Sequence, residues 1–243
     1  MTLLICRDGL IGDFTGIIPV MIELAKQDEL HVSIHPDAEI IFQLIPKKYN
    51  IQPQTPSIKY ERILELDILK TYEISKQHNC YMSQAHFAYF DLHVPKPAPR
   101  AELEFELTEE PVYDYIIAPF SRSLPPEQLW KQTNWQKLVD MMPESSFCII
   151  GHARDERNFI TGPNITEMYN ESLLKVMGTF KKLRKGVISI VSGPSHIAFH
   201  LGVKNYLLTN QPEAWGNNPD AIKICDYIPE LKANKVAEVL RKF

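Results

Sequence analysis

The chain lacks the features that mark nucleic-acid-binding, zinc-binding and membrane-spanning proteins. Its 26 lysines and arginines are balanced by 30 aspartates and glutamates, so the net charge of −4 provides no overall basic field for nucleic acid or an acidic membrane. The four cysteines, Cys6, Cys80, Cys148 and Cys225, lie far apart and form no Cys-x-x-Cys pair, which excludes the usual zinc spacings. No apolar run approaches the length that spans a membrane.

The remaining composition indicates an ordinary globular protein. Apolar residues make up 44% and charged residues 23% of the 243 residues, enough chain for one large or two small domains. The apolar run within residues 1–8 is too short for a signal peptide. We therefore expect a soluble, cytoplasmic protein, with no transmembrane segment and no nucleic-acid partner. Because Cys6 and Cys148 lie within apolar runs, we expect both thiols to be buried and reduced.

Strand-like and helix-like patterns alternate along the first part of the chain. Helices are predicted where apolar residues recur every three or four positions, and strands where short apolar or alternating runs occur. The strands are predicted at 3–6, 30–35 and 60–66, and the helices at 17–25, 38–45, 69–76 and 83–89. Strands that alternate with helices indicate a doubly wound, parallel α/β sheet.

A proline-rich run at 94–100 interrupts this pattern and predicts a stiff, exposed linker or a domain edge. The pattern then restarts, with strands predicted at 113–119, 147–150, 187–191 and 206–208 and helices at 135–142, 171–183, 195–201 and 234–240. We therefore predict two Rossmann-like domains, residues 1–107 and 108–243. A cleft between two such domains is the usual place for a ligand.

The turn after the predicted strand at 187–191 is the most informative feature of the sequence. A buried strand ends there, small residues follow, and a helical pattern begins, so backbone amides at a helix N-terminus are available to an anion such as a phosphate. Gly193 lets a ligand approach the backbone closely, and Pro194 suits the first helical turn. The alternative is an ordinary strand-to-helix turn capped by Ser192 or Ser195.

Three segments, in order, resemble the ADP-heptose:lipopolysaccharide heptosyltransferase family. Residues 12–19 look like its Gly-Asp-(five residues)-Pro opening after the first strand. Residues 118–122, with Trp130 and Trp135 after them, are similar to its succession of a strand, a loop of small residues, a Lys-x-Trp motif and an amphipathic helix. Residues 192–198 are close to its Asp-(Ser/Thr)-Gly-x-x-His-x-Ala signature. The matched positions are few, but they span most of the chain.

This resemblance implies two facing Rossmann-like domains, the GT-B architecture, and an inverting glycosyltransferase that needs neither a metal ion nor an organic cofactor. The donor would be a nucleotide-diphosphate sugar bound by residues 108–243, and the acceptor a glycan or glycolipid hydroxyl on the side of residues 1–107. The resemblance makes Asp13 the general base. The residues that it implies for donor binding are Gly12, Ser121, Arg122, Ser192, Gly193, Pro194, Ser195 and His196.

Two departures from the family pattern leave other functions open. Val191 stands where the family has Asp, and Gln128 stands where its Lys-x-Trp motif has Lys. Arg122, Lys131 or Arg154 could supply the missing positive charge. The alternatives are a non-catalytic module that binds a sugar nucleotide or glycan, and a GT-B-type nucleotide-sugar epimerase.

Several single residues also have a purely structural interpretation. Asp13 could cap a helix that starts near Thr15, and His196 could lie against the sheet. Trp215 could stack on a base or sugar, or simply pack within its loop. Residues near helical spacing after the third predicted strand form a partly buried helix face or line an acceptor groove: His78, Tyr81, His86 and Tyr89.

Overall fold

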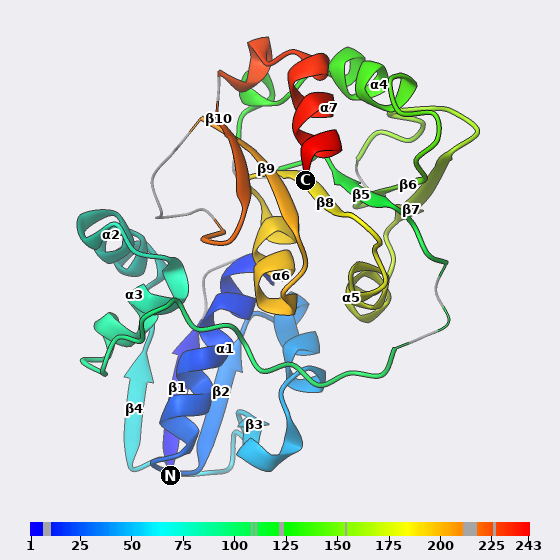
Figure 1. Ribbon diagram of the computed structural model, residues 1–243. Helices are drawn as coiled ribbons and strands as arrows, with labels where there is room; N and C mark the ends of the chain where they lie inside the picture. Colours follow the sequence, from blue (N-terminus) through cyan, green and yellow to red (C-terminus); the bar gives the residue numbers. More distant parts are fainter. Residues whose placement is uncertain are drawn as a thin grey trace. The chain divides into compact units, whose positions relative to one another are not determined.

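The computed structural model describes residues 1–6, 11–107, 109, 111–121, 124–153, 155–210, 218–225 and 227–243. The chain divides into two compact units (Figure 1). Unit 1 comprises Met1–Glu106 and Glu213–Pro219, and unit 2 comprises Leu107–Pro212 and Asp220–Phe243. Each unit contains one sheet in which every strand pair is parallel, as the sequence predicts.

Unit 1 is built on a four-stranded sheet of order β3-β2-β1-β4. Its strands are β1 Thr2–Cys6, β2 Leu30–Ile34, β3 Ile51–Pro53 and β4 Arg62–Glu65. Its helices are α1 Ile11–Ala25, α2 Ile68–His78 and α3 Met82–Tyr89, with 3₁₀ helices η1 Pro36–Gln43 and η2 Lys47–Tyr49. The predicted helix at 38–45 is therefore a 3₁₀ helix.

The core of unit 1 follows from the alternation of side chains along its strands. Leu4 and Cys6 of β1 and Val32 of β2 lie on one face of the sheet and pack with the apolar side of α1, which includes Ile17 and Met21. Figure 1 shows α1 lying along β1 and β2. Burial raises the pKa of the Cys6 thiol to about 12, so this side chain acts as a small apolar group.

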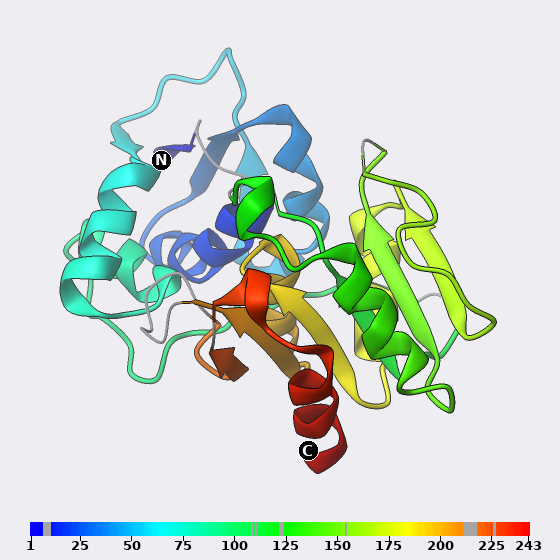
Figure 2. The same cartoon turned by 90° about the horizontal axis from the view of Figure 1, so that it is seen from above.

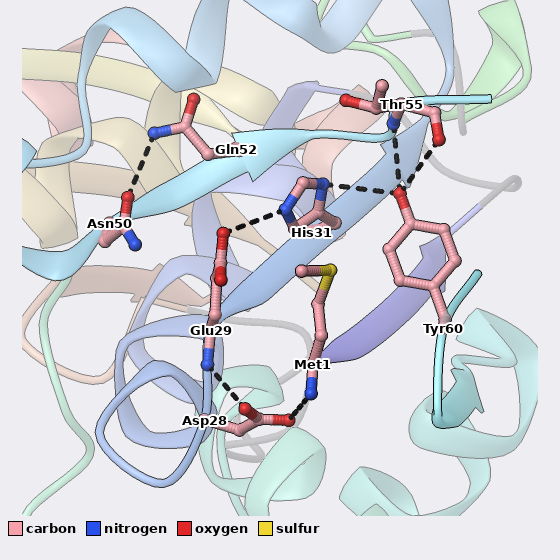
Figure 3. A network of polar contacts seen from close by, with 8 residues as sticks. All are labelled: Met1, Asp28, Glu29, His31, Asn50, Gln52, Thr55 and Tyr60. Carbon is pink, nitrogen blue, oxygen red and sulfur yellow. Dashed lines mark hydrogen bonds and ion pairs between the residues drawn. The ribbon is translucent and has the colours of Figure 1, made fainter. Parts of the chain in front are cut away.

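A network of hydrogen bonds joins residues near the amino-terminal ends of the strands of this sheet (Figure 3). Asp28 accepts a hydrogen bond from the amide of Glu29 at 2.8 Å, and the Glu29 carboxylate lies 3.3 Å from Nε2 of His31 on β2. The hydroxyl of Tyr60 lies 3.3 Å from Nδ1 of the same histidine, accepts from the Thr55 amide and donates to the Thr55 carbonyl. The connection from β3 to β4 is thereby tied to β2.

The proline-rich segment at 94–100 is not a free linker, which corrects that part of the prediction. It lies along α3, where the Gln84 side chain donates to the Pro95 carbonyl at 2.8 Å and the Ser83 hydroxyl donates to the Pro99 carbonyl at 3.1 Å. Further on, the Glu104 amide donates to the Leu44 carbonyl at 2.8 Å. The prolines have no backbone N–H to donate, and the carbonyls of Pro95 and Pro99 are satisfied by side chains of the helix beside them.

Unit 2 is built on a six-stranded sheet of order β10-β9-β8-β5-β6-β7. Its strands are β5 Tyr115–Ala118, β6 Phe147–Gly151, β7 Ile165–Tyr169, β8 Gly186–Ile190, β9 Asn205–Thr209 and β10 Ile222–Cys225. Its helices are α4 Gln132–Asp140, α5 Leu173–Lys181, α6 Gly193–Leu201 and α7 Ala233–Lys242, with 3₁₀ helices η3 Pro126–Gln128 and η4 Ile228–Glu230.

Helices cover both faces of this sheet, which explains why its central strands read as continuous apolar runs. Tyr115 and Ile117 of β5 share a core with α4 and α7, which lie side by side in Figure 2. Trp130 and Trp135 belong to the same core, with ring centroids 4.7 Å apart, and the Trp130 indole donates to the Leu231 carbonyl at 2.6 Å. Both tryptophans are therefore buried parts of the core of unit 2.

The strands that sequence analysis missed are edge or short strands. β3, β7 and β10 were not predicted, because strands with an exposed edge need fewer apolar residues than central ones. The buried state of Cys6 and Cys148 is confirmed. Within the described residues, no helix has both the length and the apolar character needed to cross a membrane.

Gly186, at the start of β8, allows a test of whether the backbone of unit 2 requires glycine at this position. Gly186 has φ +143°, and a Cβ built there would lie 2.5 Å from the Lys204 carbonyl oxygen. Gly186→Ala should lower the free energy of unfolding by roughly 2–4 kcal/mol, because neither the backbone conformation at Gly186 nor the Lys204 carbonyl just before β9 can accept the methyl group. Urea denaturation measures this change.

The matched control is Gly16→Ala on α1. A Cβ there would make only an ordinary 3.6 Å contact with the His86 ring, and alanine favours a helix interior. This variant should be neutral or more stable. Equal losses in the two variants would contradict the proposed strain at Gly186.

Candidate functional site

The turn between β8 and α6 has the backbone geometry of an anion site, with fewer donors than the sequence suggested. Ser192 is the N-cap residue with an extended backbone, and the Ser195 amide donates to its carbonyl at 3.0 Å. Pro194 has no amide hydrogen. In the described part of the chain, the amides of Ser192 and Gly193 have no protein acceptor. An anion at this helix N-terminus would therefore be held by two amides and the helix dipole.

A buried polar network anchors this turn to the sheet. The Ser195 hydroxyl donates to Oδ1 of Asn205 on β9 at 2.8 Å, and Nδ2 of Asn205 donates to the Ser189 hydroxyl at 2.8 Å and to the Val187 carbonyl at 3.1 Å. Ser195 and Asn205 are each 1% exposed. Sequence analysis missed Asn205, although a lone amide residue beside the apolar stretch 206–208 was a usable signal. As placed, Ser195 holds the start of α6, and its contact with a donor stays a prediction.

The structure brings Ser121 next to the Ser192 turn. β5 and β8 are neighbours in the sheet, so the loops that follow them meet at one edge. The Ser121 hydroxyl donates to the Val191 carbonyl at 3.2 Å. His196 is half-buried on the first turn of α6.

Of the other residues considered for donor binding outside α1, only Gln128 and Lys131 belong to the part of the chain that the structure describes. Arg122, Arg154 and Trp215 lie outside the described residues. Gln128 ends the short helix η3, and Lys131 is the exposed N-cap residue of α4.

In unit 1, the candidate base lies in the first turn of α1. The helix begins at Ile11, so Asp13 does not cap a helix starting near Thr15, and that alternative is wrong. Gly12 precedes it in the same turn. The Tyr72 hydroxyl on α2 donates to Oδ1 of Asp13 at 2.7 Å. No sequence signal had marked Tyr72, because it is 59 residues away and on a different helix.

Burial and the negative charge of Asp13 both raise the pKa of Tyr72 above its ordinary value. The phenol therefore stays protonated at physiological pH and acts as a hydrogen-bond donor. Asp13 thus has a neutral donor beside its carboxylate, in the positively polarised first turn of a helix.

His86 of α3 supports the same region from a fully buried position. Its Nδ1 lies 3.1 Å from the Gly16 carbonyl, which can only accept, so we assign the ring proton to Nδ1. Nε2 then carries a lone pair and has no hydrogen-bond partner among the residues that the structure describes. Burial lowers the pKa of His86 to about 4, although the Gly16 carbonyl and the charge of Asp13 oppose the shift. Of the predicted helix face, Tyr81 and His86 are buried, Tyr89 is half-buried and His78 is exposed.

The fold matches those of solved glycosyltransferases, although no protein-family model and no curated protein matches the sequence. The two parallel-sheet units define a GT-B-like α/β fold. More particularly, heptosyltransferase WaaC of E. coli, solved with ADP, aligns with a TM-score of 0.71 at 11% identity, over 100% of this chain and 97% of WaaC. The glycosyltransferase TibC of enterotoxigenic E. coli aligns with a TM-score of 0.66 at 15% identity.

The chain covers 63% of the length of TibC, and TibC covers 90% of this chain. A weaker match, with a TM-score of 0.50 at 11% identity over 100% of this chain and 88% of the other, is to a putative UDP-N-acetylglucosamine 2-epimerase from Listeria monocytogenes. At these identities the matches show the fold.

The buried His86 predicts how stability depends on pH. Its folded pKa of about 4 lies below the ordinary 6.5, so the unfolded chain binds more protons between these values. Stability due to this group is therefore complete above about pH 6.5 and is lost as the pH falls towards 4, by about 3 kcal/mol in total. Urea denaturation near pH 7 and near pH 4 measures the loss.

His86→Asn keeps an N–H donor for the Gly16 carbonyl but removes the titration, so its stability should depend less steeply on pH. His78→Asn on the exposed side of α2 makes the same chemical change and should leave the wild-type slope intact. A wild-type slope in His86→Asn would show that His86 is not the responsible group.

Proposed function

We propose that the protein is an inverting glycosyltransferase that moves a sugar from a nucleotide-diphosphate donor to a hydroxyl of a glycan or glycolipid, without a resident metal ion. The observation that carries this proposal is Asp13 in the first turn after β1, hydrogen-bonded to Tyr72, in a chain with a heptosyltransferase fold. Because the WaaC structure contains ADP, an ADP-sugar is the first donor to test.

In this reaction the Asp13 carboxylate takes the proton of the acceptor hydroxyl. The acceptor oxygen then forms a bond to the anomeric carbon as the bond from that carbon to the diphosphate oxygen breaks. The nucleoside diphosphate leaves with the bonding electron pair. The amides of Ser192 and Gly193 would stabilise the negative charge that develops on it, with Ser121, Pro194, Ser195 and His196 shaping the site. We assign Gly12 to the backbone beside the base and Arg122 to the diphosphate.

A non-catalytic sugar-nucleotide module is the second candidate, because Val191 and Gln128 replace the Asp and Lys of the resembled pattern. This candidate binds a donor but neither hydrolyses it nor transfers its sugar. An epimerase, the third candidate, would form product from the donor without any acceptor.

Asp13→Asn tests the base directly. Its amide keeps an oxygen that can accept from Tyr72 but cannot take up the acceptor proton, so kcat should fall by roughly 10²–10⁴-fold while nucleotide binding persists. Release of nucleoside diphosphate from ADP-heptose in the presence of a glycolipid acceptor measures kcat.

The matched control is Asp67→Asn at the N-cap of α2, where Asp67 accepts from the Lys70 amide at 3.1 Å and asparagine caps equally well. It should retain wild-type turnover. Full turnover in Asp13→Asn would remove Asp13 from the mechanism.

A thermal-shift screen identifies the donor class. ADP-, UDP-, GDP- and dTDP-sugars are compared with free adenosine, which lacks the diphosphate. A ligand at a hundred times its Kd adds about 2.7 kcal/mol to the free energy of unfolding, so a true donor should raise Tm by several degrees. We expect the ADP-sugar to give the largest rise. If none of the four raises Tm, the transferase and binding-module proposals are both wrong.

A further inference from the structure

Asp13, Tyr72 and His86 come from three different helices of unit 1 and meet at the start of α1. Tyr72 donates to Oδ1 of Asp13 at 2.7 Å, and His86 lies close enough for its protonation to respond to the charge on Asp13. α2 and α3, which supply the two supporting residues, pack on each other, and α3 packs on α1. Of these three residues, only Asp13 has a role in the proposed reaction, so the contribution of Tyr72 and His86 to it is open.

From this geometry we infer that Tyr72 is a positioning residue for the general base. Its hydroxyl fixes the orientation of the Asp13 carboxylate and stabilises the charged carboxylate, which takes up the proton of the acceptor hydroxyl. The inference rests on the proposed function. A hydrogen bond to an ionised group is shorter and stronger than one between neutral groups, and 2.7 Å is typical of it. It also restricts rotation of the carboxylate, which reduces the ordering needed to reach the reactive geometry.

The protonation states favour Tyr72 as the donor and exclude His86 as an alternative base. Tyr72 stays protonated because burial and the charge of Asp13 disfavour the phenolate. His86 is 0% exposed, so its lone pair on Nε2 cannot reach a substrate from where it lies. Its role is to hold the Gly16 carbonyl, one turn beyond Asp13, from a neutral ring. The carboxylate is therefore the group that takes up the proton, and Tyr72 sets its orientation.

Tyr72→Phe tests the inference because it removes only the hydroxyl. We expect kcat to fall by roughly 10–100-fold, the range expected for a hydrogen bond to a charged group, with the donor KM unchanged. A purely structural role would not lower kcat selectively while the donor KM stays the same.

The matched control is Tyr60→Phe, which removes another hydrogen-bonding hydroxyl from unit 1, at the amino-terminal edge of the sheet (Figure 3). Tyr60→Phe should reduce stability but leave the kcat and the donor KM of ADP-heptose turnover unchanged. If Tyr72→Phe behaves like Tyr60→Phe while Asp13→Asn is inactive, the inference is wrong and the proposed function stands. If Asp13→Asn is fully active, the proposed function itself is wrong.

A thermodynamic cycle tests the hydrogen bond without any activity. Tyr72→Phe, Asp13→Ala and the double variant are compared by thermal unfolding near pH 7. Because the two side chains interact, the double variant should lose less Tm than the sum of the single losses. Additive losses would show that the bond is not formed in solution and would overturn the inference, whether or not a donor has been found.

Discussion

Parallel pairing of the strands is the constraint on which the rest of this structure depends. In a parallel sheet every strand ends at the same edge, and each helix must begin near that edge before returning across a face. The first turn of α1 after β1 and that of α6 after β8 are both consequences of this rule. The residues with candidate chemistry, Asp13 in unit 1 and the Ser192 turn in unit 2, therefore lie where the polarity of helix starts favours negative charge.

Both helix starts are held by polar groups buried beneath them. Asn205 joins Ser195 on α6 to Ser189 on β8, and His86 joins α3 to the Gly16 carbonyl of α1. Buried polar groups are costly unless satisfied; the side chain of Asn205 has specific partners on the adjoining elements, and Nδ1 of His86 has one on α1. Such contacts fix a helix terminus more narrowly than apolar packing does, because a hydrogen bond depends on direction as well as distance.

The sequence was sufficient for the elements that local pattern determines, and insufficient for those set by distant partners. The apolar run 187–191 and the small residues after it predicted β8, the turn and α6 closely, because burial on both faces leaves a strong signal. The short edge strands β3 and β10 left almost none. The proline run at 94–100 suggested a linker, since nothing local shows that Ser83 and Gln84 would bind its carbonyls. The role of Tyr72 could not be predicted for the same reason, because its contact with Asp13 forms only when α2 packs against the rest of unit 1.

Each unit also contains a cysteine that is inaccessible in the folded state, Cys6 on β1 and Cys148 on β6. Thiol reagents react with the thiolate, and burial keeps the Cys6 thiol protonated, so its modification requires β1 to open. Alkylation followed by peptide mass mapping would then report separately on opening of the two sheets. The chain thus contains its own probes of whether its halves unfold in one cooperative step or one after the other.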